Sequence, residues 1–222
     1  MKLFKMKFFK KDTMNKDTIL LSAFIIVLSF IISAYFFPQL PDKLASHWNF
    51  SGEVDGYMPK FLGLFLMPML ALVMFALFYF LPSIDPLKKN FKKFRKYYDS
   101  FVLLMLTFLL YIYFLTLFWN LGYRFDMGRA MIPALGILFY YVGVLMEHVK
   151  TNWFVGIRTP WTLSSKRVWD KTHRLGGKLY KVAALIALAG IFFQQYAPWF
   201  VLAPVIIVSA YLVLYSYLEH RK

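Results

Sequence analysis

The sequence predicts an all-α protein that crosses a lipid bilayer six times. Of its 222 residues, 60% are apolar and 21% aromatic, which is more apolar surface than a soluble domain of this size needs. The apolar residues are gathered into uncharged blocks of about 17 to 21 residues, the length that a helix needs to cross the hydrocarbon core. Basic residues cluster in alternate connections between these blocks, as expected for a polytopic membrane protein.

Four of the uncharged runs each predict one membrane span, at 19–37, 61–81, 101–122 and 130–146. A final run, 182–218, is too long for one span and is interrupted at 194–199 by QQYAPW. We therefore expect a hairpin of two helices there, over about 179–195 and 199–218. The first run is longer than the apolar region of a typical signal peptide and lacks an A-x-A-like cleavage site, so we interpret it as a membrane helix.

The basic residues predict the orientation. Of the 26 lysines and arginines, 22 lie in the amino-terminal tail, the second and fourth connections and the carboxyl-terminal tail. Short loops rich in these residues stay in the cytoplasm, so we expect a cell-membrane protein with both ends cytoplasmic. The predicted division is a basic cytoplasmic tail at 1–17, a first helix pair at 18–81 with an extracellular loop at 38–60, a four-helix region at 82–218 with a cytoplasmic loop at 147–178, and a cytoplasmic tail at 219–222.

The net charge of +15 points to anionic lipid as the partner. The cations lie between apolar blocks rather than on one soluble face, so direct nucleic acid binding is not expected. The chain has no cysteine, which excludes disulfides, a thiolate nucleophile and cysteine-based metal or redox centres. No cofactor is predicted.

The extracellular loop contains residue types that hold metals. Its sequence, PQLPDKLASHWNFSGEVDGYMPK, has prolines, glycines and turn-capping groups and is expected to be a compact connection rather than a helix. Asp42, His47, Glu53 and Asp55 could serve as metal ligands, but their spacing matches no known ligand pattern, and turn hydrogen bonds or water would satisfy them equally well. No metal site is therefore predicted.

The cytoplasmic loop EHVKTNWFVGIRTPWTLSSKRVWDKTHRLGGK is rich in Trp, Arg, Gly and Pro. From a cap at Ser164 or Ser165 to Leu175, helical spacing separates an apolar face (Val168, Trp169, Thr172, Leu175) from a basic one (Lys166, Arg167, Lys171, Arg174). Gly176 and Gly177 are expected to end this helix. One interpretation is an interfacial amphipathic helix between the fourth and fifth spans, with its indole toward acyl chains. The other is a docking surface for a peptide or protein.

Two strings resemble a known family. NWFVGIRTPWTLSSKRVWDKTHRLGGKLY resembles the signature of the SdpI family of bacterial immunity membrane proteins, and LPDKLASHWNFSGEVDGY resembles a short domain of unknown function that commonly precedes it. The resemblance marks these binding candidates in the cytoplasmic loop: Asn152, Gly156, Arg158, Thr159, Pro160, Trp161, Thr162, Trp169, Thr172, His173 and Gly176. In the extracellular loop it marks Asp42, His47, Trp48, Asn49, Gly52, Asp55 and Gly56.

The resemblance implies a protein that protects its producer against a secreted peptide toxin. It also implies relay of the toxin's presence to a cytoplasmic regulator, such as a repressor protein. The expected partners are thus the lipid bilayer, a peptide toxin and a cytoplasmic repressor.

An enzyme and a membrane transporter are the alternatives to an immunity protein. An enzyme would need a catalytic constellation, but the spacing of Asp170 and His173 suggests only an ion pair on one helix face near Ser164 and Ser165, so no catalytic residue is assigned. A transporter of ions or small molecules would place ionisable groups inside the spans, and the predicted spans are almost free of them. Both stay as alternatives.

Overall fold

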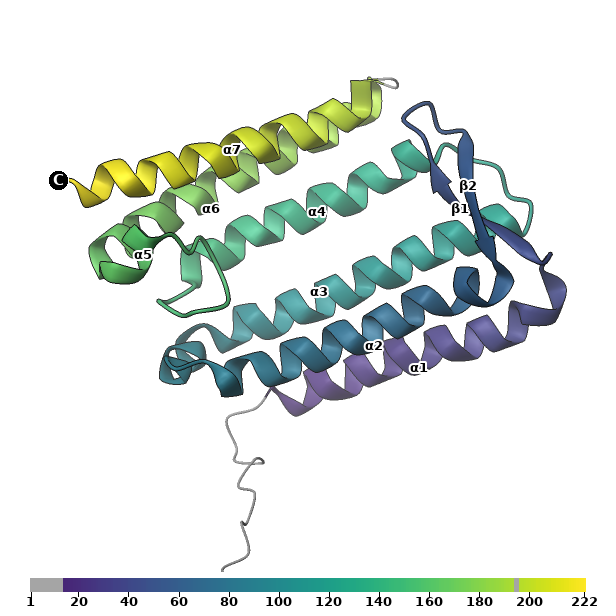
Figure 1. The fold of residues 1–222 in the computed structure, drawn as a ribbon, viewed down its shortest axis with the longest axis horizontal. Helices are drawn as coiled ribbons and strands as arrows, with labels where there is room; N and C mark the ends of the chain where they lie inside the picture. The colour runs from purple at the N-terminus through teal and green to yellow at the C-terminus, as the bar shows by residue number, and fades with distance from the viewer. Residues whose placement is uncertain (1–13, 194–195) are drawn as a thin grey trace, which may run out of the picture.

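The computed structural model describes residues 14–193 and 196–222. Within these residues, six helices are long and apolar enough to cross a membrane, which confirms the predicted polytopic helical fold (Figure 1). The predicted turn residues Gln194 and Gln195 and most of the basic amino-terminal tail lie outside the described residues. The elements are α1 (Lys16–Phe36), η1 (Phe37–Gln39), β1 (Lys43–Trp48), β2 (Val54–Pro59), α2 (Lys60–Ile84), α3 (Lys88–Asn120), α4 (Met127–His148), α5 (Pro160–Ser164), α6 (Lys166–Ala189), η2 (Gly190–Phe192) and α7 (Ala197–His220).

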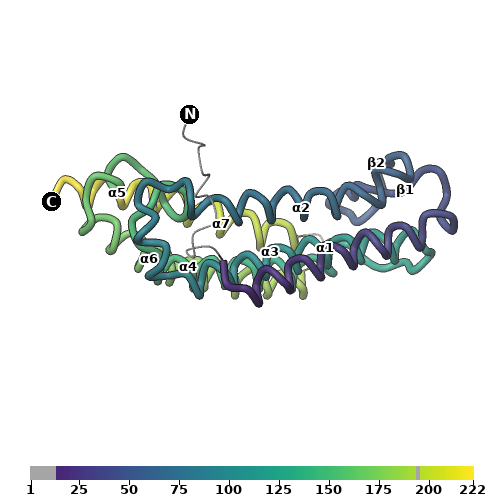
Figure 2. The backbone as a smooth tube through the Cα atoms, turned by 90° about the horizontal axis from the view of Figure 1, so that it is seen from below, coloured from purple at the N-terminus to yellow at the C-terminus, as the bar shows by residue number. Residues whose placement is uncertain are grey.

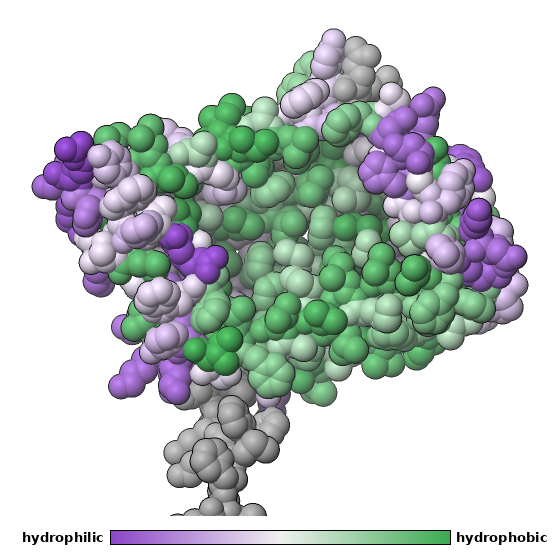
Figure 3. Space-filling view, in the orientation of Figure 1, coloured by the Kyte–Doolittle hydropathy of each residue, from purple (hydrophilic) through white to green (hydrophobic). Residues whose placement is uncertain are grey.

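The helices form a flat slab of two three-helix units. Helices α1, α2 and α3 pack together, α4, α6 and α7 pack together, and the main contact between the units is that of α3 with α4. Figure 2 shows how thin the slab is. Apolar side chains cover its middle and polar ones gather at its two ends (Figure 3), as a membrane requires.

The two ends differ in what they carry. One end of the slab carries the start of α1, helix α5 and the carboxyl terminus. We call it the motif end, and it includes residues 149–165. The β1–β2 pair lies at the opposite end (Figure 1). We call this the hairpin end, and it includes residues 37–59 and the connection 121–126.

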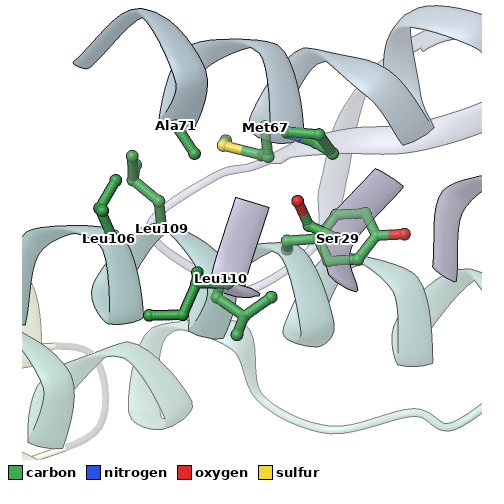
Figure 4. Close-up of a pocket in the computed structure, with 9 residues that line it drawn as sticks. Ser29, Met67, Ala71, Leu106, Leu109 and Leu110 are labelled. Atoms are coloured by element: carbon green, nitrogen blue, oxygen red, sulfur yellow. The ribbon is translucent and has the colours of Figure 1, made fainter. Parts of the chain in front are cut away.

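Two prolines inside α2 are each matched by a hydroxyl from another helix. A proline lacks the N–H that would bind the carbonyl four residues earlier, so Pro68 frees the carbonyl of Leu64. Ser33 Oγ of α1 donates to this oxygen at 2.8 Å, and Tyr113 OH of α3 lies 2.9 Å from Ser33 Oγ. A cavity of about 10 Å³ lies beside this contact, with Ser29 among its lining residues (Figure 4).

The second proline repeats the arrangement nearer the motif end. Pro82 frees the carbonyl of Phe78, and Tyr98 OH of α3 donates to that oxygen at 2.8 Å. In a membrane an unpaired carbonyl has no water to bind. Hydroxyls from α1 and α3 therefore complete the backbone hydrogen bonding of α2.

The loop between α1 and α2 is a two-stranded antiparallel hairpin. The expected compact, non-helical connection is thus built from strands, which the sequence interpretation did not specify. Asn120 at the end of α3 holds the hairpin against the bundle: its Oδ1 accepts from Ala45 N at 2.8 Å and its Nδ2 donates to Ala45 O at 3.0 Å. Leu44 is buried between the hairpin and the helices.

The predicted end of the amphipathic helix at Gly176 and Gly177 is wrong. Helix α6 continues without interruption from Lys166 to Ala189, so the amphipathic segment and the fifth span are one helix. The glycines serve a close helix crossing instead. A Cβ on Gly177 would lie 2.8 Å from the Gly143 carbonyl of α4, and one on Gly143 would lie 2.7 Å from the Gly177 carbonyl. Close packing against α4 therefore explains why glycine stands inside this helix.

The proposed lipid-facing indole is also wrong. Trp169 is 0% exposed, and its Nε1 donates to the carbonyl of Val149 at 3.2 Å. The ring therefore packs inside the protein at the motif end and cannot lie among acyl chains.

The helices carry more ionisable groups than the uncharged runs suggested, because they extend beyond those runs. Lys181 of α6 and Glu147 of α4 form an ion pair of 2.6 Å between half-buried side chains. Asp99 of α3 is buried and accepts a hydrogen bond of 3.0 Å from the backbone N–H of Asn15. Both groups join separate elements near the motif end.

Candidate functional site

Asn152 organises the start of the motif loop, residues 149–159. Its side chain is 0% exposed. The Nδ2 group donates to the carbonyls of Lys150 and Val155, both at 2.8 Å, while Oδ1 accepts from the N–H groups of Phe154 at 2.8 Å and Val155 at 2.6 Å. An asparagine side chain has two N–H donors and a carbonyl with two lone pairs, so all its hydrogen-bonding capacity is used within the loop.

Two polar residues, one in the α2–α3 connection and one in the first turn of α3, fix the loop from the other three-helix unit. Asp85 is 2% exposed and accepts from Leu87 N at 2.5 Å and from Trp153 N at 2.8 Å. Asn90 donates from Nδ2 to the carbonyl of Thr151 at 2.8 Å. Neither residue was among the candidates predicted from the sequence. The available signal was a carboxylate followed directly by proline, at the start of a strongly basic segment.

His173 fixes the next turn of the loop. Its Nε2 accepts from Ile157 N at 2.9 Å and its Nδ1 lies 2.9 Å from the carbonyl of Trp169. Nε2 as acceptor and Nδ1 as donor describe a neutral imidazole. The ring stacks on Trp169 with centroids 4.0 Å apart.

Gly156 makes this arrangement possible. Its φ is +111°, a conformation that other residues rarely adopt. A Cβ at this position would collide with the His173 ring.

The threonines of the motif begin helix α5. Thr159 and Thr162 form a reciprocal capping box at its start, which satisfies backbone N–H groups that a helix leaves free. Thr162 Oγ1 also lies 2.8 Å from the carbonyl of Ile157, to which it donates. Thr159 Oγ1 lies 3.0 Å from Ser216 Oγ of α7. The Thr159 hydroxyl therefore attaches the loop to the second three-helix unit.

The remaining candidates of the motif divide into buried and accessible groups. Thr172 is 0% exposed, and Gly176 is packed against Met146, Ile157 and Leu212. Arg158 and Pro160 are exposed. Arg158 donates from Nη1 to the Trp153 carbonyl at 2.7 Å, and the half-buried Trp161 contacts the Tyr217 ring with centroids 5.0 Å apart. The structure therefore gathers all the candidates at the motif end but leaves few of them accessible.

The carboxylates and histidine of the hairpin end are paired separately. His47 Nδ1 lies 2.5 Å from Asp55 Oδ1, Asp42 pairs with Lys60 at 3.3 Å, and Glu53 accepts from Asn49 Nδ2 at 3.2 Å. No group of three potential metal ligands occurs among residues 14–193 and 196–222. These side chains are accessible at the surface, which leaves them free to contact a partner.

The other candidates of the hairpin build its turn. Asn49 Oδ1 accepts from the N–H groups of Ser51 at 2.9 Å and Glu53 at 3.0 Å. Gly52 has a φ of +80°. A Cβ on Gly56 would lie 2.9 Å from that of His47. Trp48 packs edge-on against Trp119 of α3, with centroids 5.5 Å apart.

The residues considered for catalysis have structural partners. Asp170 pairs with Lys166 at 2.8 Å, so the expected pair with His173 is wrong. Ser165 caps the start of α6, and Ser164 Oγ donates to the Trp161 carbonyl at 3.2 Å. The geometry of these residues is that of helix caps and loop supports.

Both loop regions lie within segments that match known protein families. Residues 148–216 match the SdpI/YfhL protein family and residues 24–72 match a domain of unknown function, DUF1648. The chain is 28% identical over 204 residues to the Immunity protein SdpI of Bacillus subtilis (strain 168), covering 91% of this chain and 96% of that protein. No solved structure matches. The predicted resemblance is therefore confirmed: a segment that matches DUF1648 precedes a region that matches the SdpI/YfhL protein family.

Proposed function

We propose that this protein is a membrane immunity protein that confers resistance to a secreted antimicrobial peptide toxin. The observation that carries the proposal is its similarity to the Immunity protein SdpI over 91% of the chain. The action proposed is binding rather than catalysis. A slab rich in apolar and aromatic side chains suits an amphipathic, membrane-active peptide.

We also propose that the motif end is cytoplasmic and the hairpin end extracellular. The support is the basic composition of the connections at the motif end. Opposite locations are expected for reporters fused after Lys60 and after Lys166. Reporters on the same side of the membrane would contradict this orientation.

The toxin would meet the hairpin end and the lipid-facing helix surfaces first. His47 and Asp55 have side chains 71% and 45% exposed, which makes them candidate toxin contacts at the hairpin end. Intercepting the peptide there would prevent it from assembling a lesion in the bilayer.

The motif loop would then report the occupied state. It is hydrogen-bonded to both three-helix units, through Asp85 on one side and through Thr159 and His173 on the other. A shift of one unit against the other must therefore strain or move this loop. A cytoplasmic repressor that recognises this region would contact the exposed Arg158 of the loop and the exposed Pro160 and half-buried Trp161 at the start of α5. The buried motif residues would hold these side chains in place.

Expression in a toxin-sensitive bacterium tests the proposal. Cells producing the full chain are challenged with a panel of secreted antimicrobial peptides, and survival is measured after membrane insertion has been verified. Survival should rise for at least one peptide. Equal killing with and without the protein across the whole panel would contradict immunity.

The role of Arg158 is tested by substitution in the same survival assay. Arg158→Lys keeps the charge but loses the planar donor geometry of the guanidinium. It should therefore reduce survival if this side chain makes a bidentate or stacked contact. Arg174→Lys, at another exposed position on the same face of the membrane, is the matched control. Equal activity of both variants would indicate that Arg158 acts only as a charge.

A further inference from the structure

A single buried carboxylate at the motif end gathers three cations. Glu219, near the end of α7, has a side chain 3% exposed, whereas those of Arg167, Lys171 and Lys222 are 48%, 52% and 71% exposed. Arg167 Nη1 and Lys171 Nζ lie 2.5 Å and 2.7 Å from the same oxygen, Glu219 Oε1, and Lys222 Nζ lies 3.9 Å from Oε2. We call these four residues the Glu219 cluster.

The cluster keeps positive charge and donor capacity after its internal contacts are made. One carboxylate faces three cations, so the cluster has a net positive charge. A guanidinium has five N–H donors and an ammonium three. Arg167 uses Nη1 and Nη2 on Glu219, and Lys171 uses one donor. Because both cations contact one oxygen, their remaining donors lie close enough to share an anion.

The cluster lies where the exposed apolar surface of α7 ends, which is where lipid phosphates are expected. Helix α7 presents exposed apolar side chains, including Leu214 and Leu218, up to the residue before Glu219. It lies at one edge of the slab, packed against α6 on one side and, among the described residues, with no helix on its outer side (Figure 1).

Aromatic side chains at the same level support this placement. Trp161 packs against Tyr217, and the Arg221 guanidinium lies 5.6 Å from the centre of the Tyr217 ring. Such aromatic side chains are typical of the membrane–water interface.

We propose that the Glu219 cluster is a binding site for the phosphate of an anionic phospholipid in the leaflet at the motif end. Arg167 and Lys171 bind the phosphate oxygens, and Glu219 holds the two cations together before the lipid arrives. A structural tie between α6 and α7 would need only one cation for the one carboxylate. Basic pockets between membrane helices are known to bind anionic headgroups.

The test compares lipid binding by the full chain and by a charge-matched pair of variants. Arg167→Gln/Lys171→Gln/Glu219→Gln replaces three of the four cluster residues with neutral amides, keeps Lys222, and lowers the net charge by one. Lys178→Gln lowers it by the same amount at an exposed position of α6 outside the cluster. Removing both cations without leaving Glu219 ionised avoids an unpaired buried charge.

Native mass spectrometry with phosphatidylglycerol and phosphatidylcholine provides the measurement. The unmodified protein should retain phosphatidylglycerol in preference to phosphatidylcholine. The triple variant should bind phosphatidylglycerol about tenfold more weakly, as expected from the loss of two cations near the lipid surface. Lys178→Gln should stay within about twofold of the unmodified protein.

A milder variant covers the case in which the triple variant does not fold. Lys171→Gln leaves Glu219 paired with Arg167 and should weaken phosphatidylglycerol binding about threefold. The proposal is overturned if a folded cluster variant binds phosphatidylglycerol like the unmodified protein. It is equally overturned if Lys178→Gln causes the same loss, or if the unmodified protein does not distinguish the two lipids.

Discussion

The two ends of the molecule are both organised by an asparagine and a glycine, but in opposite environments. At the motif end, Asn152 is 0% exposed and Gly156 is packed against His173. At the hairpin end, Asn49 is part of an exposed turn, and a Cβ on Gly52 would have no contact closer than 3.7 Å. Identical residue types therefore have different structural importance, and burial rather than residue identity should decide the effect of substitution.

Substitution of the two glycines should give the largest difference. Gly156→Ala combines an unfavourable φ with a collision against His173 and should destabilise the protein by about 3 kcal/mol. Gly52→Ala introduces only the strained backbone and should cost about 1 kcal/mol. Thermal unfolding of the purified chains in one detergent measures both values, and equal losses would refute the proposed importance of the His173 contact.

The two asparagines test the same contrast through hydrogen bonds. Asn152→Ala leaves two carbonyls and two N–H groups in the buried loop without their partner and should cost about 2 kcal/mol. Asn49→Ala should cost less than about 1 kcal/mol, because water can reach the groups that it frees. A comparable loss of denaturation free energy in the two variants would mean that water enters the motif loop as easily as the hairpin.

Removing the Tyr98 hydroxyl should lower the unfolding free energy by a smaller amount, and the loss should depend on Pro82. Tyr98→Phe leaves the Phe78 carbonyl unpaired and should cost about 1 kcal/mol. In a Pro82→Ala background the restored N–H binds that carbonyl, so the same substitution should cost much less. A double-mutant cycle of unfolding free energies measures this coupling, and Tyr123→Phe, at an exposed ring of the hairpin end, is the control. Additive effects would show that Pro82 and Tyr98 are unrelated.

The exposed contact between His47 and Asp55 of the hairpin should give the smallest change in stability. Asp55→Asn removes the charge facing His47, and surface pairs of this kind contribute less than about 1 kcal/mol. The melting temperature should therefore be nearly unchanged. A large drop would show that the hairpin end depends on this pair as strongly as the motif end depends on its buried network.

The sequence predicts the membrane spans well because their signal is local. Uninterrupted apolar runs locate each helix core, and the motif strings locate both informative loops. The course of α6 was not predictable in the same way. Gly176 and Gly177 read locally as a helix end, and only the proximity of Gly143 on another helix shows that they are packing positions.

The partners of the motif loop were hidden for the same reason. Asp85 and Asn90 lie in a segment between two predicted spans whose basic composition suggests only contact with lipid. Their targets lie more than sixty residues away in the chain. The resemblance named residues of the motif but not those that fix it. Nor could the pattern separate Arg158, which is accessible, from Trp169, which is not.

The hydroxyls that complete α2 also restrict how this helix can move. Any rotation of α2 about its axis, or any change in its depth in the bilayer, would withdraw Leu64 and Phe78 from the hydroxyls of α1 and α3 and leave bare carbonyls in hydrocarbon. Rigid tilting of α1, α2 and α3 together keeps both contacts. The first three helices should therefore move as one rigid body. Relative motion within the protein should occur mainly where α3 meets α4.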